Sequence, residues 1–453
     1  MTRLFGTDGV RGIANKELTA DLVYKIGFAS ADVLANVNSH RPVFVVGRDT
    51  RISGTMLESA LVSGLTSAGA DVYLAGVIPT PGVAYLTRKH AYDAGVVISA
   101  SHNPFEHNGI KLFSSDGYKL SDETEDQIEK LIKASETVKA DLPIGEKIGQ
   151  SMKMDNASRE YADHLIEEMG VDLAGMKIAI DCANGASCYI APGLFRELGA
   201  EVIAVSVEPD GVNINLGCGS TSLSLLAETV RKEGCDLGLA FDGDADRLLA
   251  VDNEGNLADG DVIMAIIAKD MKREGKLTKN TLVATVMSNL GLINMGSDND
   301  INIVLTQVGD RYVLEEMLRS GYVLGGEQSG HIILLDHTTT GDGLLSALRL
   351  LKALKNSGQD LSQARRIMIV FPQVLINVEV ENSNKTKALD DPDVNEAIRE
   401  IEEELGDKGR IFVRASGTES IIRVMIEGEN FEDITQKAKS VAQLVRDKYG
   451  VRT

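Results

Sequence analysis

The chain has 453 residues and a formal charge of −21, from 46 basic and 67 acidic side chains. A chain of this length is expected to form three or four domains of ~100 to 200 residues each. The acidic balance argues against general nucleic-acid or anionic-membrane binding, so an anionic substrate needs a local cationic pocket.

The expected location follows from targeting signals and cysteine usage. The N-terminal residues form no apolar leader segment, and no stretch approaches about 18 consecutive apolar residues. The four cysteines show no C-x-x-C spacing and are typical of reduced thiols. We therefore expect a cytoplasmic protein.

The first predicted elements form a β-α-β unit. An amphipathic helix is expected over residues 22–34, followed by a buried strand over 43–46. Apolar residues at three- and four-residue intervals predict a helix over 56–68 that ends at Gly69. Residues 71–75 predict the next strand.

The following stretch brings a serine to the end of a strand. Residues 96–98 form a β-branched run that predicts a buried parallel strand, with Ser101 just beyond its carboxyl end. Ligands bind at this edge of open α/β sheets. Asn108-Gly109 predicts a turn, so Ser101 is expected on a sharply turned loop with His102 beside it.

The β-α-β pattern recurs twice. Strands are predicted over 177–181 and 201–205, around a helix over 191–198. Residues 282–286 and 301–305 form a weaker third copy. This repetition predicts three tandem, similar α/β domains with mixed sheets.

The C-terminal part follows another pattern, which predicts an α+β domain. Strands are expected over 367–380, 411–413 and 421–426, and helices over 394–405 and 431–449. The predicted domains are residues 1–152, 153–253, 254–366 and 367–453.

The strongest chemical motif is Asp242-Gly-Asp-Ala-Asp-Arg247, which lies between two apolar runs. In an extended segment, alternate side chains share a face, so Asp242, Asp244 and Asp246 should converge. Their repulsion is a few kcal/mol per pair at an effective dielectric of ~20, and a hard divalent cation relieves it. We expect Mg²⁺, with a solvated acidic turn as the alternative. An EF-hand is disfavoured because Arg247 stands where its loop needs glycine.

A second motif, Gly325-Gly-Glu-Gln-Ser-Gly-His331, presents polar side chains at alternate positions. Glu327, Ser329 and His331 suit the recognition of hydroxyl groups on a ligand. A polar turn without a function is the alternative.

A third motif, Val413-Arg-Ala-Ser-Gly-Thr-Glu-Ser420, predicts a phosphate site in this acidic chain. Hydroxyls, backbone N–H groups and arginine forks together form a concave anion site, although a plain hairpin turn is the alternative. The candidate binding residues are Arg414, Ser416, Gly417, Thr418 and Arg423.

Ser101 is the candidate nucleophile. Enzymes that act on phosphate monoesters must lower the barrier by roughly 20 kcal/mol or more, which a hydroxyl alone cannot achieve. Lys111, Arg247 and His331 could supply charge and proton transfer beside the aspartate loop. A further glycine-rich motif, Phe5-Gly-Thr-Asp-Gly-Val-Arg-Gly12, presents Arg11.

With these motifs in family order, the chain resembles the α-D-phosphohexomutase superfamily over essentially its full length. The motifs are Ser-Ala-Ser-His-Asn-Pro, Asp-Gly-Asp-Ala-Asp-Arg, Gly-Glu-Gln-Ser-Gly-His and Arg-Ala-Ser-Gly-Thr-Glu. The resemblance implies three α/β domains and a fourth α+β domain around a central active-site cleft. Ser99 stands where many relatives have threonine, which should not affect the nucleophile.

The resemblance also implies roles for the motif residues. Ser101 would be a phosphoserine whose phosphate completes one Mg²⁺ site per chain with the three aspartates. Lys111 and His331 would be general acid and base in an unassigned order, with His102 among the catalytic residues. Arg11 and Arg247 would stabilise charge on the transferring phosphoryl group.

The implied reaction interconverts hexosamine 6- and 1-phosphates through a sugar 1,6-bisphosphate and supplies UDP-N-acetylglucosamine synthesis. Gln328 favours an amino sugar, because glucose- and mannose-directed relatives usually have methionine there. The alternatives are a glucose- or mannose-directed mutase, a metal-dependent phosphatase and a non-catalytic sugar-phosphate-binding regulator. The expected partner is a small hexosamine phosphate, with a homodimer as the candidate assembly and neither nucleic acid nor membrane.

Overall fold

The structure is a computed structural model that describes residues 3–6, 8–38, 40–134, 142–416 and 420–451. The chain divides into two compact units. The large unit comprises Met1–Met287 and Ile301–Ile367, and the C-terminal unit comprises Ser288–Asp300 and Met368–Thr453. None of the described helices has the length and apolar character needed to cross a membrane.

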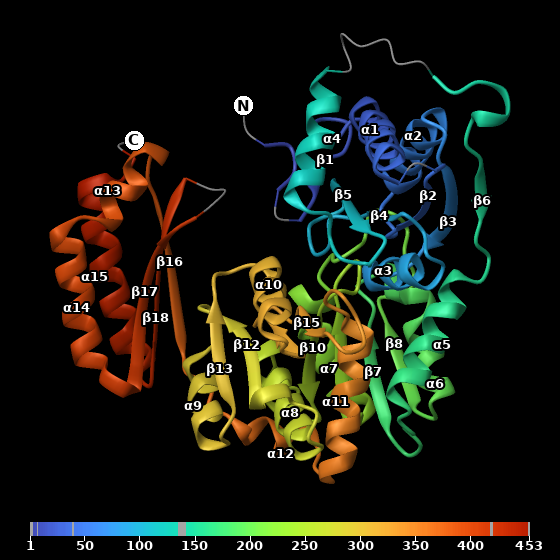
Figure 1. The fold of residues 1–453 in the computed structure, drawn as a ribbon. Coiled ribbons are helices and arrows are strands. Elements are labelled where there is room, and N and C mark those ends of the chain that lie inside the picture. The colour runs from blue at the N-terminus through green and yellow to red at the C-terminus, as the bar shows by residue number, and fades with distance from the viewer. Residues whose placement is uncertain (1–2, 7, 39, 135–141, 417–419, 452–453) are drawn as a thin grey trace. The chain divides into compact units, whose positions relative to one another are not determined.

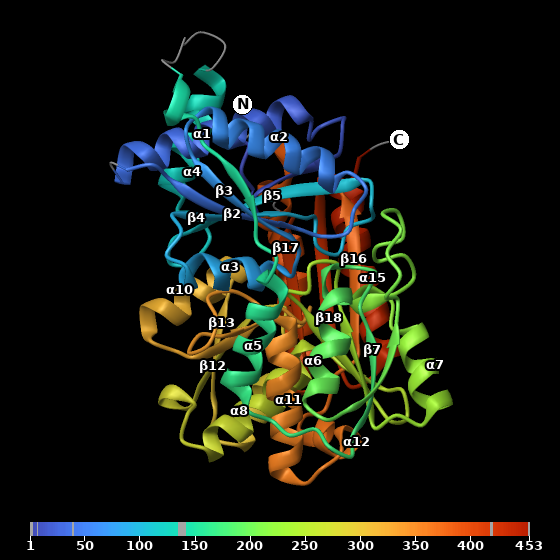
Figure 2. The same ribbon diagram turned by 90° about the vertical axis from the view of Figure 1, so that its right-hand side faces the viewer.

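The first sheet of the large unit has the strand order β1-β5-β4-β2-β3-β6. Strands β2, β3 and β4 are parallel, whereas β5 pairs antiparallel with β4 and β1. Helices α1, α2 and α4 cover one face and α3 the other (Figure 2). The elements are β1 (Val10–Ile13), α1 (Ala20–Asn38), β2 (Val43–Arg48), α2 (Gly54–Ser67), β3 (Asp71–Val77), α3 (Thr80–Lys89), β4 (Ala94–Ile98), β5 (His107–Ser114), α4 (Asp122–Ala134) and β6 (Ser151–Lys153).

The second sheet has the order β11-β10-β9-β7-β8. Its strands β7, β8 and β10 are labelled in Figure 1. Strand β7 is parallel to β8 and β9, and β10 returns antiparallel beside β9. The β9–β10 connection carries the aspartate motif. The elements are α5 (Ala157–Met169), β7 (Lys177–Asp181), α6 (Ala191–Glu197), β8 (Glu201–Val205), α7 (Ser224–Glu233), β9 (Leu237–Phe241), β10 (Leu248–Asp252) and β11 (Leu257–Ala258).

The third sheet has the order β13-β12-β14-β15. Strand β12 is parallel to β13 and β14, and β14 forms an antiparallel hairpin with β15. The hairpin loop carries Glu327 and Ser329. The elements are α8 (Gly260–Arg273), β12 (Thr281–Thr285), β13 (Asn302–Thr306), α10 (Asp310–Ser320), β14 (Leu324–Gly326), β15 (Ile332–Leu334), α11 (Gly343–Ser357) and α12 (Leu361–Ala364).

The C-terminal unit is an antiparallel sheet of order β16-β18-β17 with helices packed on it. Helix α9 belongs to this unit, although its sequence lies between β12 and β13. Glu427, fully buried in β18, accepts hydrogen bonds from Leu290 N at 3.0 Å and Arg410 Nε at 2.7 Å. The elements are α9 (Leu290–Asp298), β16 (Gln373–Glu379), α13 (Lys385–Leu389), α14 (Pro392–Leu405), β17 (Gly409–Ala415), β18 (Ile421–Gly428) and α15 (Phe431–Tyr449).

The predicted fold class is confirmed, since three α/β sheets precede an α+β sheet. Two local predictions are wrong. Asn108-Gly109 is not a turn, because these residues pair with Gly12 and Arg11 inside β5. The strand predicted from residue 367 begins only at Gln373, after Pro372, which has no N–H to donate to a ladder.

Candidate active site

Ser101 lies just beyond β4 and is 1% exposed. Its φ of 53° is a left-handed value that residues with a Cβ seldom adopt. Its Oγ donates a hydrogen bond of 2.5 Å to Asp242 Oδ2, while His102 Nδ1 lies 3.3 Å from the same Oγ. Burial, helped by Arg247 and Arg11, lowers the pKa of His102 to about 4, so its ring is neutral near pH 7.

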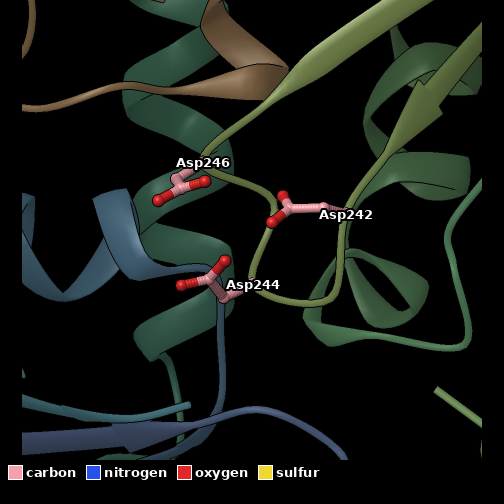
Figure 3. Close-up of side chains that lie close together, drawn as sticks. All are labelled: Asp242, Asp244 and Asp246. Atoms are coloured by element: carbon pink, nitrogen blue, oxygen red, sulfur yellow. The ribbon is translucent and has the colours of Figure 1, made fainter. Parts of the chain in front are cut away.

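The three aspartates of the β9–β10 connection point toward a common centre (Figure 3). One carboxylate oxygen from each of Asp242, Asp244 and Asp246 lies within 4.8 Å of the others. The convergence predicted from the spacing is present, but a turn produces it rather than an extended segment. Ala245, with φ of 56°, lies at this turn.

The triad has the character of a cation site. All three side chains are buried, and Oδ1 of Asp244 and Oδ1 of Asp246 have no hydrogen-bond partner among the described residues. Burial raises the pKa of Asp242 well above its usual range, and Asp246 and Asp244 add to this rise. Buried carboxylate oxygens that lack hydrogen-bond partners are suitable ligands for a hard divalent cation. The three aspartates therefore suit a metal cofactor.

Lys111 belongs to a network of ion pairs that connects the first and third sheets. Its Nζ lies 2.9 Å from Asp244 Oδ2 and 3.3 Å from Asp8 Oδ2. Lys119 Nζ lies 2.8 Å from Asp8 Oδ1 and 2.6 Å from Asp310 Oδ2. Burial opposes the charge of Lys111, but the surrounding carboxylates outweigh it and raise its pKa.

Sequence reasoning missed three members of this network: Asp8, Lys119 and Asp310. Asp8 lies inside the motif that presents Arg11, so that motif contained a usable signal. Lys119 and Asp310 are 191 residues apart and carry no local pattern.

His331 is enclosed between the aspartate turn and α10. Its Nδ1 lies 3.5 Å from Asp246 Oδ2, and its Nε2 accepts a hydrogen bond of 3.1 Å from Gly341 N. Burial lowers the pKa of His331, but Asp246 and Asp310 outweigh it and raise the pKa overall. Both ring nitrogens therefore have protein partners.

Two arginines lie beside the same cluster. Arg11, in β1, pairs with Asp8, and its Nε is buried without a hydrogen-bond partner within the described chain. Arg247 Nε lies 3.7 Å from Asp246 Oδ1. The structure thus places Ser101, His102, Lys111, His331 and both arginines around the aspartate turn.

The loop between β14 and β15 packs directly against β10. Leu248 N donates to Gly330 O, and Gly330 has a φ of 92°. A Cβ there would lie 2.3 Å from Leu248 O, so only glycine fits. Glu327 Oε1 accepts from Gly309 N at 3.0 Å, whereas the buried Ser329 Oγ has no partner among the residues described.

The predicted phosphate site lies in the C-terminal unit. Arg414 and Arg423 face each other across β17 and β18, and burial together with Arg423 lowers the pKa of Arg414. Like charges at directly opposite positions repel, which an anion would relieve. Ser416 is buried at the end of β17, and Gly417 and Thr418 lie outside the described residues.

The chain matches all four domains of one protein family. Residues 2–139, 159–255 and 259–370 match alpha/beta/alpha domains I, II and III of the phosphoglucomutase/phosphomannomutase family. Residues 375–444 match the C-terminal domain of that family.

Similar proteins and structures cover nearly the whole chain. It is 56% identical to a phosphoglucosamine mutase of Acetivibrio thermocellus, over 99% of this chain and 100% of that protein. It is 55% identical to one of Clostridium acetobutylicum over the same shares. Its fold is similar to a phosphoglucomutase/phosphomannomutase family protein from Burkholderia thailandensis, with a TM-score of 0.82, 21% identity and 99% and 98% of the two chains covered.

Proposed function

Because the chain belongs to the phosphoglucomutase/phosphomannomutase family, we infer that it is an intramolecular phosphotransferase that interconverts glucosamine 6-phosphate and glucosamine 1-phosphate. The observation that carries this inference is the hydrogen bond from Ser101 Oγ to Asp242, inside a buried carboxylate cluster. The full-length relatives named phosphoglucosamine mutase support the choice of sugar. This activity supplies the amino-sugar phosphate for UDP-N-acetylglucosamine synthesis.

Ser101 is the proposed phosphoryl carrier. Its phosphorylated form transfers the group to O1 of glucosamine 6-phosphate, and the resulting 1,6-bisphosphate returns its 6-phosphate to Ser101 after turning around. The same bisphosphate phosphorylates Ser101 when the enzyme starts without phosphate. The hydroxyl suits this role because its hydrogen bond to Asp242 fixes the direction of Oγ.

We propose one Mg²⁺ per chain, held by Asp242, Asp244, Asp246 and Ser101. When bound, the ion neutralises negative charge on the transferring group. Oδ1 of Asp244 and Oδ1 of Asp246, which have no hydrogen-bond partner in the described parts of the chain, support this assignment.

Charge and proton transfer fall to the groups around the turn. Arg11 and Arg247 stabilise the transferring phosphoryl group from positions beside the aspartates. Lys111 and His331 remain the candidates for acid and base, with His102 as a neutral neighbour of Ser101.

Binding of the substrate requires a site that accepts either end of the sugar. Glu327 and Ser329 are proposed to hold sugar hydroxyls. The Ser329 hydroxyl supports this role, because it has no hydrogen-bond partner among the residues that the structure describes. The phosphate that does not react is assigned to the loop formed by Arg414, Ser416, Gly417, Thr418 and Arg423. The opposed pair Arg414 and Arg423 supports an anion at this loop.

We also propose that each predicted domain supplies one of these loops. Residues 1–152 carry the phosphoserine, 153–253 the metal site, 254–366 the sugar loop and 367–453 the phosphate loop. The cysteines that the structure describes are free, which agrees with a cytoplasmic location. Sedimentation of the purified protein will decide between a monomer and the homodimer considered from the sequence.

The test is a direct comparison of sugars. Purified protein is incubated with Mg²⁺, a trace of sugar 1,6-bisphosphate and glucosamine, glucose or mannose 6-phosphate, and phosphorus NMR follows the 1-phosphates. We expect glucosamine to be preferred and Ser101→Ala to be inactive. Preference for another sugar would contradict the assigned substrate, and stoichiometric release of inorganic phosphate would indicate a phosphatase.

A further inference from the structure

Arg51 is an arginine without a role in the reaction above, yet it is only 1% exposed. It lies in the segment that follows β2, and its Nε donates 2.8 Å to Asp49 Oδ2. Its remaining donors all reach the loop that carries Ser101. Nη2 donates to Ser101 O and Asn103 O, each at 2.8 Å. Nη1 donates to His107 O at 3.0 Å and to Pro104 O.

Asp49 joins this arginine to a second contact with Ser101. Its Oδ2 also accepts a hydrogen bond of 2.6 Å from Ser99 Oγ. The same Ser99 Oγ accepts Ser101 N at 2.9 Å. Arg51 therefore holds the carbonyl of Ser101 and Ser99 holds its N–H, the groups on either side of the Ser101 Cα.

The two contacts explain how Ser101 keeps its backbone conformation. A left-handed φ is unfavourable for a residue with a Cβ, and glycine, which adopts it freely, has no hydroxyl to carry phosphate. Hydrogen bonds to both flanking peptide groups offset this strain, and they aim Oγ at Asp242.

The second sheet contributes to the same anchor. Asn215 Nδ2 donates to Ser101 O at 2.9 Å and to Asn103 O at 3.2 Å. A Cβ on Gly243, in the aspartate turn, would lie 2.5 Å from Ser101 O. The carbonyl of Ser101 is thus fixed directly against the turn that holds Asp242 and Asp244.

We propose that Arg51 and Ser99, joined through Asp49, are positioning residues that hold Ser101 in the left-handed conformation needed for phosphoryl transfer. Within the described residues of the large unit, none of the three forms a hydrogen bond with the β14–β15 loop that carries Glu327 and Ser329. Their effect on catalysis rests on the proposed function, whereas their effect on phosphorylation of Ser101 requires only a phosphate donor.

The decisive variants change one hydroxyl. Ser99→Ala removes the acceptor for Ser101 N, and Ser99→Thr retains it. We expect Ser99→Ala to lower kcat by about 10- to 100-fold, because small misplacements of a reacting group have effects of this size. KM for glucosamine 6-phosphate should change less than twofold, and Ser99→Thr should restore most of kcat.

Ser30→Ala is the matched control, since Ser30 is equally buried in α1 and away from the loop. Its kcat should equal that of the wild type. Arg51→Lys keeps the charge beside Asp49 but loses the planar fork, and should lower kcat at least as much as Ser99→Ala. If Arg51→Lys fails to fold, the Ser99 pair decides alone.

Phosphorylation of Ser101 gives a readout that does not depend on the sugar. Dephosphorylated protein is mixed with glucose 1,6-bisphosphate, and intact-mass measurements follow the gain of phosphate. We expect Ser99→Ala to gain it at least tenfold more slowly than wild type. Equal rates in wild type and Ser99→Ala, or an equal loss in Ser99→Thr, would overturn the positioning role, whereas no gain in wild type would instead contradict the proposed function.

Discussion

Ser101 Oγ donates to Asp242 Oδ2 at 2.5 Å, although the two residues are separated by 141 positions in the chain. The contact joins a loop of the first sheet to a turn of the second. The packing of two sheets therefore brings the hydroxyl and the carboxylates together. A substitution in the Ser101 loop should alter the position of Asp242, and a substitution in the aspartate turn should alter the position of Ser101.

Replacement of Ser101 by alanine should abolish the reaction. We expect kcat/KM to fall by at least about 10⁴-fold, as when a nucleophile is removed from an enzyme of this kind. Intact mass after incubation with glucose 1,6-bisphosphate should show no added phosphate. Ser114→Ala, which changes a hydroxyl at the end of β5, is the control and should retain activity. Retained turnover in Ser101→Ala would exclude Ser101 as the carrier.

Removal of Mg²⁺ should abolish activity and lower stability. The ion binds the folded chain, so a free concentration about 100 times Kd should raise the free energy of unfolding by about 2.7 kcal/mol. Asp242→Asn should abolish this gain. Without the ion it should be more stable than wild type by on the order of 1 kcal/mol, because one repelling carboxylate is gone.

Thermal unfolding with and without Mg²⁺ measures both effects. The exposed Asp298→Asn is the control and should respond to Mg²⁺ as wild type does. An equal gain for Asp242→Asn and wild type would place the ion elsewhere.

Loss of the Lys119 ammonium should weaken the connection between the first and third sheets. Lys119→Met leaves Asp8 and Asp310 without their shared cation. We expect the free energy of unfolding to fall by about 2–4 kcal/mol in urea titrations. Adding Asp310→Asn should recover part of this loss, since one of the two facing carboxylates is then neutral. Additive losses would show that the pair is not coupled.

Arg414→Gln should weaken binding of the sugar phosphate with little effect on the fold. We expect KM for glucosamine 6-phosphate to rise by about 10- to 100-fold, the loss of one charge-assisted hydrogen bond of about 1.5–3 kcal/mol. The free energy of unfolding should not fall, because Arg423 loses a like-charged neighbour. The exposed Lys408→Gln, before the same strand, is the control. An unchanged KM would remove Arg414 from the phosphate site.

The raised pKa of Asp342 predicts that the stability of the protein depends on pH. Asp342 is the N-cap of α11, accepts the Tyr161 hydroxyl at 2.7 Å, and burial raises its pKa from 3.8 to about 6. Between about pH 4 and 6 the unfolded chain loses this proton while the folded chain keeps it. The contribution of Asp342 to the free energy of unfolding therefore falls as pH rises, by up to about 3 kcal/mol.

Asp342→Asn keeps the cap and carries no charge. Its free energy of unfolding, relative to wild type, should therefore grow by about 3 kcal/mol between pH 4 and 7. Urea titrations at several pH values measure the difference, with Asp360→Asn at the exposed cap of α12 as control. If the difference in the free energy of unfolding between Asp342→Asn and wild type does not change with pH, the pKa of Asp342 is not raised in the folded protein.

Local patterns predicted the repeated β-α-β units and the aspartate turn, because burial and spacing are encoded within a few residues. The ion pair between Lys119 and Asp310 could not be predicted in this way, since only the packing of two sheets brings these side chains together. Arg51 stands in a polar stretch after β2, and no motif in the sequence marks it. Its burial under the Ser101 loop required the tertiary structure.

The errors have the same origin. Asn108 and Gly109 have turn propensity, but pairing with β1 satisfies their backbone groups inside a strand. Ala245 turns the aspartate segment, whereas its sequence between two apolar runs suggested an extended path.

Helix α9 makes the C-terminal unit discontinuous in sequence. The unit contains Ser288–Asp300 as well as the segment after Ile367, so the chain passes between the two units three times. Asn289 bonds both backbone groups of Phe371 at 3.0 Å, and the N–H of Leu290 binds buried Glu427. A gene fragment that begins at Met368 would encode the sheet without these partners. The C-terminal unit is therefore not a transplantable module, and chimaeras between relatives should exchange α9 together with it.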